Sequence, residues 1–130
     1  PSDSLTLADL HSSYSYVHLW LDDVRESLKH ANKSAEFAEK AGDLDNQIRL
    51  LSKLAKLYED AEYLQEAIQF YQKIMKLPDD KVYQGQSLDK KLIFQKMMTL
   101  QIKYDKLEYE SITQQMNEIF PEHKTQNQNQ

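Results

Sequence analysis

The feature that most constrains the fold is the helical spacing of apolar residues in residues 51–78, LSKLAKLYEDAEYLQEAIQFYQKIMKLP. In the first part of this stretch the apolar positions are three and four residues apart, at Leu51, Leu54, Ala55 and Tyr58. The second part repeats that spacing at Leu64, Ala67, Ile68, Tyr71, Ile74 and Leu77. Residues spaced in this way form one stripe along a helix. Two stripes can close on each other, so the pattern predicts two antiparallel helices.

The rest of the chain is too poor in turn residues for a β fold. It has 2 glycines and 3 prolines in 130 residues, and its apolar spacing is helical almost throughout. A β-sandwich or a doubly wound sheet would need many more turns. We therefore predict an all-α domain that buries roughly two-thirds of its unfolded surface.

Residues 47–78 resemble one unit of the tetratricopeptide repeat, whose pattern is W-x2-L-G-x2-Y, then A-x3-F, then P. Leu51, Leu54, Ala55 and Tyr58 stand at the first four positions, Ala67 and Tyr71 at the next two, and Pro78 ends the unit. The resemblance implies antiparallel hairpins stacked as a short right-handed α-solenoid. It also implies a protein that binds other proteins.

We expect one domain at residues 1–120 and a disordered polar tail at 121–130. Six helices would form three hairpins, at about 7–41, 44–77 and 88–120. Asp22 and Asp23 suit the start of the second helix, and Gly42 suits its end. Residues 78–87, PDDKVYQGQS, are predicted to be a loop that turns at Gly85.

The first helix, at 7–21, is expected to pack through Leu10, Tyr14, Val17 and Leu21, after an N-cap at Ser4 or Thr6. The first hairpin resembles a degenerate repeat when Ser27 is set against Ala67. A plain helical hairpin would explain the same residues.

The fifth helix, at 88–104, has an apolar arc wider than one packing partner requires. Leu92, Phe94, Met98 and Ile102 cannot all turn inward together with Ile93, Met97 and Leu100. In one account a sixth helix at 108–120 and the preceding loop cover the excess. In the other, Phe94 and Met98 line the end of a binding groove or meet a second copy in a homodimer.

Several functions are disfavoured. Interleaved charges with a net of −5 argue against nucleic acid as a partner, and no apolar run is long enough for a membrane span. Without cysteine there are no disulfides or thiolate zinc sites, which favours a cytoplasmic protein. The chain begins at Pro1, so we expect a piece of a longer protein.

No catalytic or cofactor motif is present. His11 and His18 are about 10 Å apart along one helix, too far for two ligands of one metal ion. Acidic pairs at helix ends are explained by capping. We therefore expect neither an enzyme nor a bound cofactor.

In the tetratricopeptide family the first helix of each repeat lines a concave groove that receives a peptide or helix. Carried onto this chain, the groove positions are Arg49, Ser52, Lys53, Lys56 and Glu59. Their cations would suit an acidic partner segment. The Lys and Asn positions of the family's carboxylate clamp hold Ser52 and Lys56, so no such clamp is predicted.

Three functions remain open from the sequence. The first is an adaptor or scaffold that holds a peptide in its groove. The second is a regulatory or chaperone-like domain of a larger protein that senses a peptide. The third is a self-association unit.

Overall fold

A computed structural model describes residues 2–78, 82–83, 86–87 and 89–121. Five helices account for most of this part: α1 (Ser2–Trp20), α2 (Val24–Ala41), α3 (Leu44–Asp60), α4 (Leu64–Met75) and α5 (Lys90–Ile119). Two short strands, β1 (Val82–Tyr83) and β2 (Gln86–Ser87), pair antiparallel between α4 and α5. The predicted all-α fold is confirmed.

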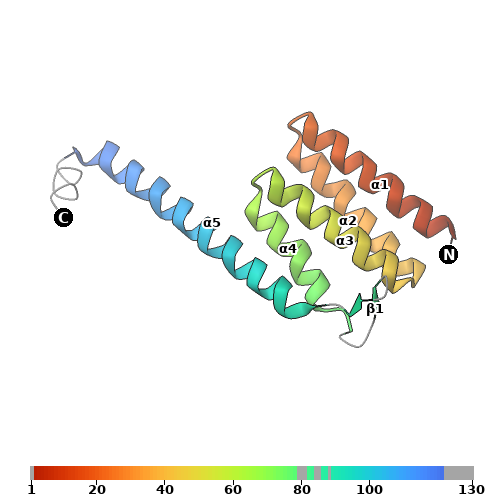
Figure 1. Cartoon of the computed structure of the whole chain (residues 1–130). Helices are drawn as coiled ribbons and strands as arrows, with labels where there is room; N and C mark the ends of the chain where they lie inside the picture. Colours follow the sequence, from red (N-terminus) through yellow and green to blue (C-terminus); the bar gives the residue numbers. More distant parts are fainter. Residues whose placement is uncertain (1, 79–81, 84–85, 88, 122–130) are drawn as a thin grey trace.

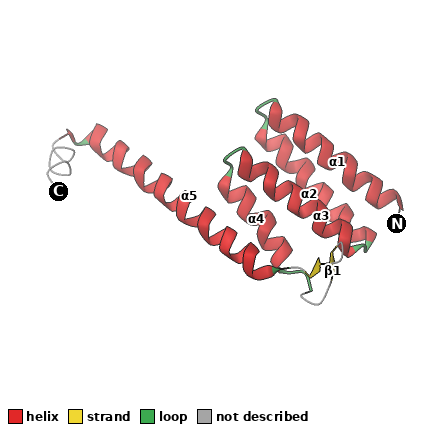
Figure 2. Ribbon diagram, in the orientation of Figure 1, coloured by secondary structure: helices red, strands yellow, loops and turns green. Residues whose placement is uncertain are grey.

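Helices α1 and α2 form one antiparallel hairpin, and α3 and α4 form a second that stacks on the first (Figure 1). Helix α5 packs beside α4 with its first half and then leaves the stack, so that its second half projects away (Figure 2). The described chain is thus two hairpins followed by one long helix.

The core is centred on α3 and α4. Leu54, Tyr58, Ala67 and Ile74 are fully buried, and Tyr71 is 9 % exposed, as their spacing predicted. The rings of Tyr58 and Phe70 stack with their centroids 5.6 Å apart. This interior is formed by the positions that carry the repeat pattern.

Helix α1 packs through a different face from the one its apolar spacing predicted. Its buried residues are Ala8, Ser12, Ser15 and Leu19, whereas Leu10, Tyr14, Val17 and Leu21 are exposed. The facing surface of α2 is also made of small residues, namely Ser27, Ala31, Ser34, Ala35 and Ala38. Small side chains let the two backbones approach, and Ser34 Oγ donates a hydrogen bond of 2.7 Å to the carbonyl oxygen of Ala8. Helix α1 therefore packs on α2 through its small residues, and its stripe of larger apolar residues faces outward.

Helix starts and stops largely follow the expected capping. Asp23 and Asp43 accept hydrogen bonds from the backbone N–H groups of Glu26 and Asn46, at 3.2 and 3.3 Å. Gly42 has φ +69°, the left-handed conformation that glycine adopts without strain. The N-cap prediction was wrong, because α1 begins at Ser2 and includes Ser4 and Thr6.

The predicted third hairpin at 88–120 was wrong, and the described chain has five helices where six were expected. Residues 90–119 form one continuous helix. Residues 105–107, where a turn was expected, include neither glycine nor proline, and two of the three, Lys106 and Leu107, are good helix formers. Gly85 and the tail beyond Pro121 lie outside the described residues.

Candidate functional site

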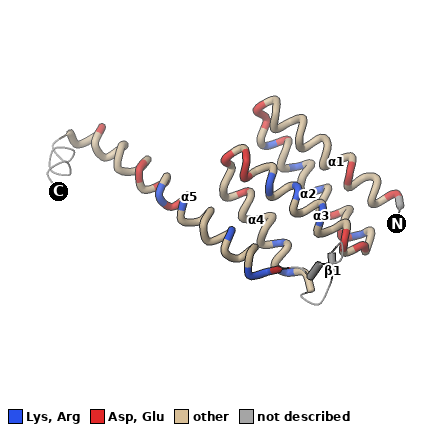
Figure 3. The backbone as a smooth tube through the Cα atoms, in the orientation of Figure 1, with Lys and Arg blue, Asp and Glu red and all other residues tan. Residues whose placement is uncertain are grey.

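The first helix of each hairpin and α5 share one face, which we call the first-helix face. Its residues lie on α1, α3 and α5, and three contacts between these helices define it. Arg49 Nη2 lies 3.0 Å from Asp9 Oδ1, and Lys96 Nζ lies 2.8 Å from Glu59 Oε2. Lys53 Nζ lies 5.7 Å from the centre of the Tyr16 ring. Figure 3 shows the basic residues along α3 and the first half of α5.

Arg49 is held by contacts within the chain. Its Nη2 donates to Asp9 across to α1, and its Nε donates to Asn46 Oδ1 at 3.1 Å. The guanidinium therefore joins the two hairpins. An incoming carboxylate would have to compete with Asp9 for it.

Lys56 also has an internal partner. Its Nζ lies 3.1 Å from Asp60 Oδ1, one turn along α3. Hydrogen bonding to Asp60 and the charges of Asp60 and Glu59 raise the pKa of Lys56 above its usual value. The pair is exposed, so solvent screens it and a partner can reach it. Ser52, the smallest of the predicted residues, is half-buried.

Glu59 joins three helices. On α4, Tyr71 Oη donates a hydrogen bond of 2.7 Å to Glu59 Oε1. On α5, Lys96 Nζ forms an ion pair with Glu59 Oε2. Burial raises the pKa of Glu59, but the hydrogen bonds from Lys96 and Tyr71 outweigh it, so the pKa lies below its usual range. Burial and the Glu59 carboxylate raise the pKa of Tyr71 far above its ordinary value. Glu59 thus fixes α5 to the stack.

Among the predicted cations, Lys53 differs from Arg49 and Lys56 in having no carboxylate partner among the described residues. It forms no ion pair with any residue that the structure describes, and it lies against the ring of Tyr16. One helical turn beyond Tyr16 lies Trp20, which is 87 % exposed. Leu92, one turn before Lys96 on α5, is 62 % exposed. The first-helix face therefore combines apolar side chains with cations.

Five further residues of this face were not predicted from the sequence: Tyr16, Trp20, Leu92, Lys96 and Lys103. Lys103 Nζ lies 3.6 Å from Glu62 Oε1, which continues the row along α5. The seven-residue spacing of Lys96 and Lys103 was visible in the sequence. The side of the protein that these two lysines face was not visible in the sequence, because it depends on how α5 packs against α4.

Three histidines gather between α1 and α2. His11 Nδ1 and His30 Nδ1 are 2.8 Å apart, and the rings of His18 and His30 stack at 5.3 Å. Desolvation by burial is the first cause that lowers the pKa of both His11 and His30, and nearby positive charge adds to it. Across the described ranges, no group of three or more His, Cys, Asp or Glu side chains could hold a metal ion. We interpret this cluster as packing.

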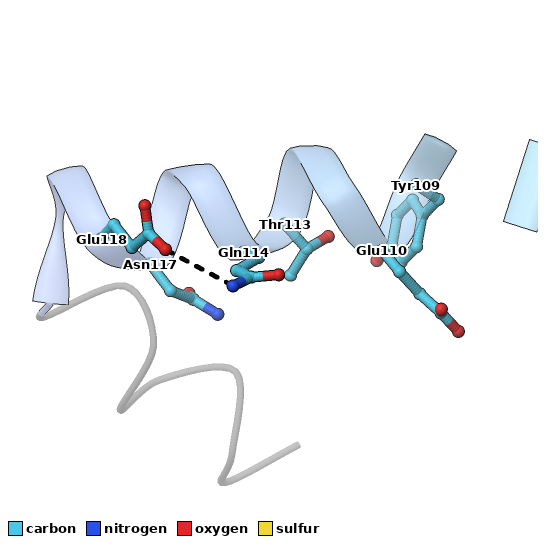
Figure 4. A pocket seen from close by; sticks show the side chains of 6 residues that line it. All are labelled: Tyr109, Glu110, Thr113, Gln114, Asn117 and Glu118. Atoms are coloured by element: carbon cyan, nitrogen blue, oxygen red, sulfur yellow. Dashed lines mark hydrogen bonds between the residues drawn. The ribbon is translucent and has the colours of Figure 1, made fainter. Parts of the chain in front are cut away.

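Two hollows lie along α5. One of about 370 Å³ is lined by Tyr109, Glu110, Thr113, Gln114, Asn117 and Glu118, all from α5 (Figure 4). A single helix cannot enclose a ligand, so we do not treat it as a site. The other, of about 290 Å³, lies between α5 and the start of α4 and is lined by Tyr63, Tyr104 and Leu107 among others.

Two stacked antiparallel helical hairpins, with the first helices aligned on one face, define an α-solenoid. A family model described as tetratricopeptide repeat matches residues 6–79, more than half of the chain and both hairpins. The chain belongs to the tetratricopeptide repeat family. No match was found among curated proteins or among solved structures. None of the described helices is long and apolar enough to cross a membrane.

Proposed function

We propose that this protein is an adaptor that binds an extended or helical segment of another protein on its first-helix face. Members of the tetratricopeptide family generally mediate protein–protein interaction. The observation that carries the proposal is the exposure of Trp20, at 87 %, one turn from Tyr16. Aromatic residues are the side chains most enriched where proteins bind one another.

The charge on this face favours an acidic partner with an apolar side chain. Lys53 lacks a carboxylate partner among the described residues, and the Lys56–Asp60 pair is exposed. Opposite charges at the rim of an interface speed association and select the partner. Trp20, Tyr16 and Leu92 would receive the apolar part of the segment.

Calorimetric titration with short synthetic peptides tests the proposal. Acidic peptides that carry one Leu or Phe should bind, whereas basic peptides with the same apolar residue should not. Lys53→Glu combined with Lys56→Glu should weaken binding several-fold and reduce its dependence on salt. Arg49 is left unchanged in this test, because its replacement would disturb the contact with Asp9.

A matched control is Lys29→Glu together with Lys33→Glu, which makes the same charge change on exposed positions of α2. This control should bind acidic peptides almost as the unaltered protein does. Equal weakening by both double variants would mean that net charge alone drives binding. That result would remove the first-helix face as the site.

A further inference from the structure

Helix α5 has two apolar stripes on different sides. The first is formed by Ile93, Met97, Leu100 and Tyr104, which pack against the core. The second runs the length of the helix, and its members are 38–72 % exposed: Phe94, Met98, Ile102, Tyr109, Ile112, Met116, Ile119 and Phe120. At about 100° per residue, the second stripe lies more than a third of a turn around the helix from the first. We call it the outer stripe.

The second half of α5 has no other part of the described chain to pack on. The 30 residues of α5 are about 45 Å long, whereas the 12 residues of α4 are about 18 Å long. Beyond its first half, helix α5 leaves the stack (Figure 1). A helical segment as short as the second half of α5 is marginally stable in water by itself. Helices in proteins gain most of their stability from packing of an apolar face.

The architecture indicates what kind of element would cover the outer stripe. Helix α1 packs along antiparallel α2, and α3 packs along antiparallel α4. Helix α5 follows α4 as the first helix of a further hairpin would, yet no antiparallel helix follows it in the described residues. A second copy related by a two-fold axis perpendicular to α5 would place its own α5 antiparallel to this one. Such a contact uses the same surface twice and closes after two chains.

The spacing of the outer stripe suits this pairing. Ile102, Tyr109 and Met116 are seven residues apart, and so are Met98, Asp105, Ile112 and Ile119, which is the repeat of a coiled coil. In one antiparallel register Ile102 faces Ile119 of the second copy, and Tyr109 faces Ile112 of the second copy. Asp105 then faces Met116 of the second copy. Within its own chain, the Asp105 carboxylate accepts a hydrogen bond of 3.0 Å from Gln101 Nε2. One polar residue in such a seam sets the register at some cost in stability.

Charges and area agree with this register. Lys106 faces Thr113 of the second copy and Glu108 faces Gln115 of the second copy, so no like charges meet. A register shifted by seven residues would bring the two Glu108 side chains together, which is unfavourable. Six side chains of the outer stripe, from Ile102 to Phe120, face the second copy in this register and present on the order of 600 Å² of apolar surface. A standard interface buries about 800 Å² per partner.

We propose that two copies of this chain associate through antiparallel pairing of their α5 helices along the outer stripe. The first-helix face stays open in the pair, because Leu92, Lys96 and Lys103 lie on the opposite side of α5. The dimer would present two such faces and gain avidity for a partner with two binding segments. This inference concerns a different surface from the proposed function, so either can fail alone.

Sedimentation velocity from low micromolar to near-millimolar concentration tests the pairing. The chain of 15.3 kDa should shift to a species of twice that mass as its concentration rises. Ile112→Glu should abolish the shift, because it places a charge at the centre of the seam. Gln114→Glu adds the same charge on another side of α5 and should leave the shift unchanged. Circular dichroism should show both variants folded, since both positions are exposed.

Three results would overturn the proposal. A monomer at every concentration would mean that the outer stripe does not pair with the α5 helix of a second copy. A dimer that persists in the Ile112→Glu variant would place the contact elsewhere. Species that keep growing beyond a dimer would indicate a head-to-tail contact, for example between the outer stripe and the exposed apolar side of α1.

Cysteine pairing tests the direction, because the natural chain has no cysteine. Mixed Tyr109→Cys and Ile112→Cys chains should give a crosslinked product that contains one of each. Ile112→Cys alone should crosslink poorly. Efficient crosslinking of Ile112→Cys with itself would indicate parallel helices and would overturn the antiparallel arrangement.

Discussion

The hydroxyl oxygen of Tyr58 lies 2.7 Å from Oγ of Ser27, and this hydrogen bond joins the two hairpins in the interior of the protein. Ser27 Oγ also donates to the carbonyl oxygen of Ser15 at 2.7 Å. The side chains of Tyr58 and Ser27 are fully buried. One serine therefore links α1, α2 and α3 at the position where the second hairpin has Ala67.

Ser27→Ala should lower the free energy of unfolding by about 1–3 kcal/mol, because it leaves the buried Tyr58 hydroxyl without its partner. Chemical denaturation measures this change. Ser12→Ala is the matched control, since Ser12 Oγ is buried and has no hydrogen-bond partner among the described residues. The control should be neutral or stabilising. A loss of stability in Ser12→Ala equal to that in Ser27→Ala would refute the role of the hydrogen bond.

Leu54→Ala should destabilise the protein by about 2–5 kcal/mol, because Leu54 is fully buried in the core of α3 and α4. Leu10→Ala removes the same atoms from the exposed side of α1 and should cost far less. The two midpoints of thermal unfolding provide the comparison. Similar losses would mean that α1 packs through its larger apolar stripe after all.

Glu59→Ala should cost about 1–3 kcal/mol, since it leaves the buried Tyr71 hydroxyl without its acceptor and α5 without its ion pair. Glu62→Ala breaks the exposed pair with Lys103 and should change stability by less than about 0.5 kcal/mol. Hydrogen exchange should report faster opening at the start of α5 in the first variant only. Unchanged exchange there would contradict the role given to Glu59.

Stability should fall as the pH drops through the range in which histidine titrates. The pKa values of His11 and His30 are lower in the folded protein than the 6.5 of an unperturbed histidine, so the unfolded chain binds more protons there. The unfolding free energy is therefore full above about pH 6.5 and decreases below it, until the folded-state values are reached. His11→Asn should flatten this slope in denaturation curves measured from neutral to mildly acidic pH. A slope of the opposite sign would contradict the lowered pKa values.

Local spacing predicted most of α2, α3 and α4, because their starts and stops rest on short-range chemistry such as Asp43 and Gly42. The packing face of α1 could not be found in this way. Its Ala8 and Ser12 are buried only because α2 offers an equally small surface. The stripe of α5 that packs on the core ends at Tyr104. This end was interpreted as the end of a helix, although the backbone continues as one helix to Ile119.

The candidate site was predicted as a row of positions on α3, and the structure places that row on the first-helix face. The ion pairs of Arg49 with Asp9 and of Glu59 with Lys96 were not predictable, because Asp9 and Lys96 come from helices distant in sequence. The width of the apolar arc left open whether Phe94 and Met98 are covered or exposed, and they are 52 % and 49 % exposed. Contact through them stays a prediction.

The most direct test of binding on the first-helix face uses Trp20, which is the one tryptophan of the chain and lies on that face. Its emission should move to shorter wavelength as an acidic peptide with one Leu or Phe is added, because the indole then loses contact with water. The midpoint should match the affinity found by calorimetry, and Lys53→Glu should shift it to higher peptide concentration. Calorimetric binding of these peptides with no change in Trp20 emission would contradict the account, because the partner would then bind away from this face.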